Sequence, residues 1–203
     1  MLLSADRRRL LAVIMMLCLS LASTADAGPV AAWDLAAADA DTIADATGHG
    51  HDAHLSGASV GEARGRRFLQ TGPDACAVGP AIGDGWSALT VVAVVDQQRP
   101  AESYSGIVAR DMYGGPDGDA FGIVTDPEGN WVGRVRTAAG QASVSAPGVV
   151  GWHQLAMTWD GAALRLYVDG EAAAETALAG QIVAAPDTPL VFGAYSNLNG
   201  WYD

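Results

Sequence analysis

The sequence predicts an all-β domain, an antiparallel sandwich or barrel, from three observations. Short runs rich in Val, Ile, Trp and Tyr recur along the chain after residue 27. Turn-forming clusters such as "GGPDGD" and "DPEGN" separate these runs at the spacing of antiparallel strands. In the clearest runs, apolar and polar side chains alternate with a period of two. The expected strands are 30–35, 87–98, 105–111, 120–126, 130–136, 152–159, 163–170 and 189–195.

The first 27 residues have the pattern of a secretory signal peptide. Three arginines, Arg7 to Arg9, precede an apolar run from Leu10 to Ala22, and Ala25-Asp26-Ala27 follows. This run is shorter than the about 20 residues that a membrane-spanning helix needs. We therefore expect export to the periplasm, the cell surface or the extracellular space. A single domain over residues 28–203 then remains, with no membrane span after cleavage and with Cys76 as its one cysteine.

The charge balance argues against two classes of partner. The chain carries a formal net charge of −12 and contains no Lys. Nucleic acids and anionic membranes are bound through clustered positive charge, so neither is expected as a partner. Cations held by carboxylates are consistent with the same composition.

The stretch "GWHQLAMTWDGAALRLYVDGE" predicts a hairpin of two half-buried strands. Asp160-Gly161 lies between its apolar runs, and a short loop that ends in Gly is a strong hairpin signal. In each run, alternate residues share a face. The Ala-rich run after Asp169-Gly170 follows a turn signal, so we expect a strand with small side chains there. In the first strand, His153, Leu155, Met157 and Trp159 share a face, and in the second, Leu164, Leu166 and Val168 share one.

This hairpin resembles the signature of the laminin G-like, concanavalin A-like lectin and glucanase family. The family pattern W-H-x-V-A, an Asp-Gly turn and L-x-L-Y-V-D-G stands here as Trp152–Ala156 and Leu164–Gly170. "VAAWDL" with "DATGHGHDAHLSG" is similar to the family's opening strand and loop. "PLVFGAYSNLNGWYD" is similar to its penultimate strand and the loop that follows. The resemblance covers 29–203 and implies a two-sheet antiparallel jelly-roll sandwich.

One departure from the family pattern concerns the carboxyl end. The family normally adds a closing strand of the type G-x-I-D-E-V-x-I-Y, which pairs with the opening strand, and this pattern is missing here. We expect the sequence to be a fragment of a larger exported polypeptide, truncated at its C-terminus. The edge along Ala31–Leu35 should then be open.

The resemblance also implies Ca²⁺ as a candidate cofactor, at the seam of the terminal strands. Ca²⁺ takes six to eight oxygen ligands from carboxylates, carbonyls and water. The first choice of ligands is the set Asp34, Asp45, Gly48 and His51. The second is the acidic loop with Asp111, Asp117 and Asp119, which is equally typical of a solvated hairpin tip.

Aromatic residues near loops are the candidates for ligand binding. Sugars stack on exposed rings, although buried rings are just as ordinary in β-sandwich cores. The candidates are Trp86, Tyr104, Tyr113, Tyr195 and Trp201.

Three motifs suggest an enzyme, and each has a simpler interpretation. "HGHDAH" nearly matches the zinc run H-x-H-x-D-H, but its Asp falls one position early. "GASVG" places Ser59 in a nucleophile-elbow pattern without the strand–helix context that the elbow requires. Glu171 and Glu175 would share one strand face, but no third acid accompanies them.

We therefore expect a secreted, non-catalytic binding module for a glycan or a surface protein, with Ca²⁺ as a candidate aid. The alternative is a structural spacer domain of a larger exported protein. A glycan-active enzyme of the jelly-roll superfamily is the third hypothesis.

Overall fold

The computed structural model describes residues 28–63, 65–111, 120–196 and 198. Within them the chain forms strands and one short 3₁₀ helix, and no α-helix. The elements are η1 (Leu35–Ala37), β1 (Thr42–Ile43), β2 (Ala53–Ser56), β3 (Ser59–Ala63), β4 (Arg66–Gln70), β5 (Cys76–Val78), β6 (Leu89–Gln97), β7 (Ser105–Arg110), β8 (Phe121–Thr125), β9 (Asn130–Thr137), β10 (Gly140–Pro147), β11 (Gly151–Trp159), β12 (Ala163–Val168), β13 (Glu171–Ala177) and β14 (Val191–Phe192).

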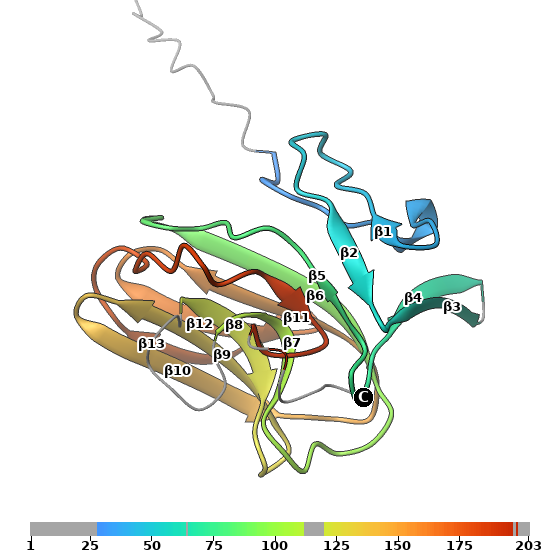
Figure 1. Ribbon diagram of the computed structural model, residues 1–203. Helices are drawn as coiled ribbons and strands as arrows, with labels where there is room; N and C mark the ends of the chain where they lie inside the picture. The colour runs from blue at the N-terminus through green and yellow to red at the C-terminus, as the bar shows by residue number, and fades with distance from the viewer. Residues whose placement is uncertain (1–27, 64, 112–119, 197, 199–203) are drawn as a thin grey trace, which may run out of the picture.

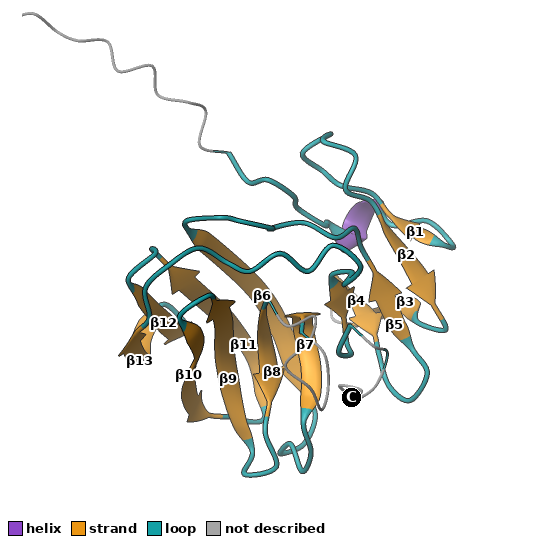
Figure 2. Cartoon of the chain, turned by 60° about the vertical axis from the view of Figure 1, so that its left-hand side comes forward, coloured by secondary structure: helices purple, strands orange, loops and turns teal. Residues whose placement is uncertain are grey.

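The strands form two stacked sheets and a separate hairpin (Figure 1). The large sheet has the order β1-β2-β5-β14-β7-β8-β9-β10, and the small sheet has the order β13-β12-β11-β6. Every pairing between these strands is antiparallel. β1 to β5 gather at one side of the molecule, and β3 and β4 pair only with each other (Figure 2). The predicted antiparallel jelly-roll sandwich is confirmed.

The predicted signature hairpin is β11 and β12. Its register pairs Trp159 with Leu164 and Leu155 with Val168. At the turn, the Asp160 carboxylate accepts hydrogen bonds from the backbone N–H groups of Ala162 and Ala163 at 3.0 and 2.8 Å. Gly161 there has a φ of +85°, a conformation that favours glycine.

An ion pair closes the same turn. The Arg165 guanidinium donates to the Asp160 carboxylate at 2.7 Å and to the Glu175 carboxylate at 2.8 Å. The hydrogen bond from Arg165, followed by those of the two backbone N–H groups, lowers the pKa of Asp160 to about 2. The short Asp-Gly loop is therefore held by Arg165 of β12, which Glu175 of β13 also contacts.

The core lies between the two sheets, where the predicted apolar face of the hairpin meets the large sheet. Because side chains alternate along a strand, the apolar ones lie on the inner face of each sheet. Their burial there is the main contribution to the stability of the fold. The cluster includes Leu155, Met157, Trp159, Leu164 and Leu166 from the small sheet, and Phe121, Ile123, Trp131 and Val135 from the large one.

The expected opening strand forms only in part. Trp33 makes a single antiparallel bridge to Asp45, and a 3₁₀ helix begins two residues later. The Asp34 carboxylate accepts the backbone N–H of Ala36 at 2.9 Å, which caps this helix and turns the chain away from extended pairing. The Ala-rich run, in contrast, forms β13 as predicted.

The two glutamates of β13 do not share a face, contrary to expectation. The pairing shifts between Leu166 and Tyr167, so that Glu171 lies opposite Val168 while Glu175 lies opposite Arg165. Val168 and Arg165 are three residues apart in β12 and point to opposite faces. The β-bulge, which the sequence pattern did not reveal, separates the two carboxylates.

Candidate functional site

The first predicted cation site is a turn organised by one carboxylate. Asp45 Oδ1 accepts the backbone N–H groups of Ala32 at 3.1 Å and Thr47 at 3.0 Å, while Oδ2 accepts that of His51 at 3.2 Å. The Thr47 hydroxyl donates to the same carboxylate at 2.7 and 2.8 Å from its two oxygens. The indole N–H of Trp33 closes the turn by donating to the His51 carbonyl at 2.7 Å. We call residues 45–52 the Asp45 turn.

These donors set the protonation of Asp45. Burial raises the pKa of this carboxyl, but the hydrogen bonds from Thr47, Ala32 and His51 outweigh it. The net result is a pKa well below its ordinary value of 3.8. A carboxylate has room for about four hydrogen-bond donors, and Asp45 already accepts from four groups.

The other predicted ligands at this turn also have roles within the chain. Asp34 caps η1, and Gly48 lies in the turn with a φ of +76°. His51 uses its backbone N–H and carbonyl to hold the turn. Within 28–63, 65–111, 120–196 and 198, no group of three or more His, Cys, Asp or Glu side chains is placed to hold a metal ion. Calcium at the Asp45 turn remains a prediction.

The near-zinc run "HGHDAH" is divided between the Asp45 turn and β2. The His49 and His51 rings lie 6.5 Å apart, centroid to centroid. His49 Nδ1 lies 2.9 Å from the Val30 carbonyl, and His54 Nδ1 lies 3.3 Å from the Thr42 hydroxyl. The run therefore contributes to local turn and strand contacts.

Of the second predicted cation loop, only Asp111 lies within the described residues; Asp117 and Asp119 lie outside them. Asp111 is buried, and its carboxylate lies 3.6 Å from the Arg134 guanidinium. Its backbone N–H donates to the Ser196 hydroxyl at 3.1 Å.

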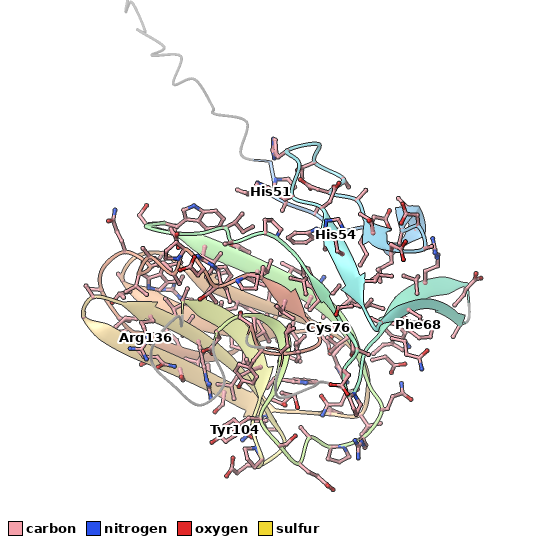
Figure 3. The ribbon with its side chains drawn as sticks, in the orientation of Figure 1. His51, His54, Phe68, Cys76, Tyr104 and Arg136 are labelled. Atoms are coloured by element: carbon pink, nitrogen blue, oxygen red, sulfur yellow. The ribbon has the colours of Figure 1, made fainter. Side chains whose placement is uncertain are left out.

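The predicted ligand-binding aromatics have different positions. Trp86 is half-buried and packs against the main core, while Tyr195 is 1% exposed and packs against Ala109, Val124 and Val132. Tyr113 and Trp201 lie outside the described residues. Tyr104 is 40% exposed. It lies at the far end of the molecule from His51 (Figure 3).

The Tyr104 ring is held in place by a cation. The Arg134 guanidinium carbon lies 5.7 Å from the ring centroid, within the range of a cation–π contact. Arg134 in turn faces the buried Asp111 carboxylate. Tyr104 therefore presents an aromatic surface whose orientation is fixed from the large sheet.

A hollow of about 280 Å³ adjoins Tyr104 along the chain. We call it the Tyr104 hollow. Its lining comes from the β6–β7 segment and the end of β8. Gln97, Ser105 and Thr125 form a buried floor, and Arg99, Pro100, Ala101, Glu102 and Ser103 form the rim.

Contacts within the protein position the polar floor. The Trp131 indole N–H donates to Gln97 Oε1, and the Thr125 hydroxyl donates to the Ser103 carbonyl at 3.0 Å. The Ser103 and Ser105 hydroxyl oxygens lie 3.3 Å apart. Donors and acceptors that are held in fixed positions suit a ligand with several hydroxyl groups.

Sequence reasoning found Tyr104 but missed Gln97, Ser105 and Thr125. These residues lie at the end of β6, the start of β7 and the end of β8, which meet at one end of the sandwich. The sequence did contain an indication of this site, because each of the three is a polar residue near the boundary of an expected strand. Only the pairing of Ser105 with Thr125, and of Thr125 with Trp131, brings them together.

The described part of the chain has no helix that is long and apolar enough to cross a membrane. Ser59 begins β3 with no helix after it, which leaves the nucleophile-elbow motif without its structural context.

Solved structures with a similar fold include binding domains and parts of glycan-active enzymes. The binding domain of Paraclostridial Mosquitocidal Protein 1 superposes with a TM-score of 0.60 at 12% identity, over 76% of this chain and 42% of that one. Domain 4 of AbnA, an extracellular arabinanase from Geobacillus stearothermophilus solved with arabinotriose, gives 0.56 at 14%, over 78% and 79%. Trypanosoma rangeli sialidase gives 0.51 at 19%, over 77% and 26%.

The chain thus spans less than half of the length of the first and third of these structures. No curated protein matches the sequence. The model of the concanavalin A-like lectin/glucanase superfamily matches residues 80–203, which include β6 to β14. The chain belongs to the concanavalin A-like lectin/glucanase superfamily.

Proposed function

We propose that this protein is an exported carbohydrate-binding module that holds its glycan at the Tyr104 hollow. One observation carries the proposal: a hollow has a buried floor of amide and hydroxyl groups, and the half-exposed Tyr104, in contact with Arg134, lies between its lining residues Ser103 and Ser105 in the sequence.

The chemistry of the hollow matches that of a sugar. A pyranose or furanose ring offers apolar C–H faces that pack on an aromatic ring, and hydroxyl groups that both donate and accept hydrogen bonds. The floor supplies hydroxyls from Ser105 and Thr125 and an amide from Gln97. The rim adds one cationic and one anionic side chain, Arg99 and Glu102.

The hollow favours binding over hydrolysis. Glycoside hydrolysis typically uses two carboxyl groups on either side of the scissile bond, about 5 to 9.5 Å apart. Among the described residues that line the hollow, Glu102 is the one carboxylate.

The similar structures support the same class of function. One is a toxin's binding domain, and another is an arabinanase domain in complex with arabinotriose. The signal-like sequence at residues 1–27 supports export. The alternative function, a spacer domain without a ligand, would leave the Tyr104 hollow without a partner.

A glycan array tests the proposal. The full chain is applied to an array that includes arabinotriose and sialylated oligosaccharides, and positive spots are measured by calorimetry. We expect Tyr104→Ala to weaken binding by roughly tenfold or more, the equivalent of about 1.4 kcal/mol. The matched control is Tyr167→Ala, on the outer face of the small sheet, which should leave affinity unchanged.

Two results would count against the proposal. Folded wild-type protein that binds no glycan would favour the spacer function. Binding that survives Tyr104→Ala would place the ligand elsewhere on the domain.

A further inference from the structure

A series of side-chain contacts joins an exposed carboxylate to the floor of the Tyr104 hollow. Trp131 is fully buried and donates its indole N–H to Gln97 Oε1. The Trp131 ring also contacts the imidazole of His153, with 5.1 Å between the ring centroids and 55° between the ring planes. His153 Nδ1 in turn lies 2.7 Å from Asp169 Oδ2. The contacts thus run from Asp169 through the two rings to the amide on the floor.

Asp169 determines which nitrogen of His153 carries the proton. The backbone N–H of Gln154, and after it the His153 ring, lower the pKa of the Asp169 carboxyl. A carboxylate only accepts hydrogen bonds, so Nδ1 of the imidazole is the donor. Nε2 is therefore the nitrogen that gains or loses a proton. The His153 side chain is 17% exposed, so water reaches the ring.

The backbone provides a second link between His153 and the floor. His153 Nε2 lies 3.9 Å from the position that a Cβ on Gly151 would occupy. Gly151 begins β11 and pairs with Gln97 at the end of β6. The nitrogen that exchanges the proton is thus beside the residue that faces Gln97 across the ladder.

The charges around the His153 ring are few. In the described part of the chain, Asp169 is the one charged group in hydrogen-bond or ion-pair contact with it. The strands packed against the ring carry other charged residues, which alternate with core residues and lie on the opposite faces. They are Asp96 of β6, Arg134 and Arg136 of β9, and Arg165 of β12. A protonated ring therefore places its charge between a carboxylate and an indole.

We propose that His153 is a positioning residue of the glycan site and makes glycan binding depend on pH, an inference that rests on the proposed function of the Tyr104 hollow. An imidazolium is attracted both to the Asp169 carboxylate and to the ring of Trp131. Both attractions hold the indole, and through its N–H the Gln97 amide, more firmly than a neutral ring does. Histidine is the side chain whose charge changes between about pH 5 and 8. Glycan affinity should therefore be higher at the acidic end of this range.

Calorimetry of the full chain at about pH 5 and about pH 8 tests the proposal, with the glycan that gives the strongest array signal as the probe. We expect the affinity of wild type to be roughly threefold higher at the lower pH. His153→Gln cannot be protonated and should bind equally at both. His54→Gln, which removes an exposed histidine of β2, is the matched control and should keep the wild-type response.

A milder variant separates the charge from the fold. Asp169 has a φ of +52°, a conformation that asparagine also tolerates. Asp169→Asn keeps an acceptor for the ring and removes the negative charge. It should therefore reduce the pH response of binding while the melting temperature stays near that of wild type.

A second measurement tests the same contacts without a glycan. The indole N–H of Trp131 gives its own signal in a ¹⁵N NMR spectrum, identified by its loss in Trp131→Phe. We expect this signal to shift between about pH 5 and 8 in wild type and in His54→Gln, and to stay fixed in His153→Gln.

Two results would overturn the inference and leave the proposed function standing. One is glycan binding of equal affinity at both pH values in wild type. The other is a pH-dependent shift of the Trp131 signal that survives His153→Gln. Folded protein that binds no glycan at either pH would remove the proposed function, and this inference with it.

Discussion

The Asp45 turn and the Tyr104 hollow lie at opposite ends of the molecule (Figure 3). They differ in how far apart in the sequence their polar groups lie. In the turn, the Asp45 carboxylate accepts from three backbone N–H groups and one hydroxyl of its own neighbourhood. In the hollow, side chains from three strand ends converge on open space. The turn holds its own backbone in place, whereas we propose that the hollow accepts a ligand.

The difference shows that a dense run of acids and histidines can also build a turn. Asp and Asn side chains readily bond to backbone groups two or three residues away, and such local bonds build turns. Asp45 with Thr47, Asp39 with Thr42 and Asp126 with Glu128 are three examples. Convergence of residues that are far apart in sequence is the better guide.

The largest expected effect is on stability, from removal of the Asp45 carboxylate. Asp45→Ala leaves the N–H groups of Ala32, Thr47 and His51 without their acceptor. We expect the melting temperature to fall by roughly 5 °C or more. Asp34→Ala, which removes a single cap bond, is the control and should fall by much less. Equal shifts in thermal melts of the two variants would contradict the structural role of the turn.

The pH dependence of stability should follow from the same carboxylate. Its pKa is lowered in the folded state, so the unfolded chain binds more protons in acid and stability rises with pH. The contribution is complete above the ordinary pKa of 3.8 and is lost as the pH falls toward the lowered value. We expect the melting temperature of wild type to fall more steeply below about pH 4 than that of Asp45→Asn. Parallel curves would show that Asp45 is not responsible.

The smallest expected effect is that of calcium. If Ca²⁺ binds the Asp45 turn, it competes with hydrogen bonds that are already made. Millimolar Ca²⁺ should therefore raise the melting temperature by only about 1–3 °C relative to chelator. Asp45→Asn should abolish that rise. An unchanged melting temperature in wild type would remove the calcium hypothesis.

Much of the fold could be predicted from the sequence, because strand alternation and turn chemistry are local. The β11–β12 hairpin, its buried face and the Ala-rich strand were all predicted from residues within a few positions of one another. The opening strand was overestimated, since the capping of η1 by Asp34 competes with extended pairing. The bulge that separates Glu171 from Glu175 depends on packing between strands, which has no local signal.

The candidate site was less predictable for a physical reason. Gln97, Ser105 and Thr125 are ordinary residues in the sequence and become a floor only through sheet register. Tyr104 was one of five aromatic candidates. It differs from Trp86 and Tyr195 in its larger exposure and in its contact with Arg134. The Arg134 contact joins residues about 30 positions apart, which no local pattern reveals.

The most direct test of the account is to locate a bound glycan by NMR. The full chain, labelled with ¹⁵N, is titrated with the oligosaccharide that gives the strongest array signal, and amide shifts are followed. We expect the shifts to concentrate at residues 97–105 and at Thr125, with those of the Asp45 turn unchanged. Shifts that concentrate at residues 45–52, with the Tyr104 hollow silent, would contradict the assignment of the binding site.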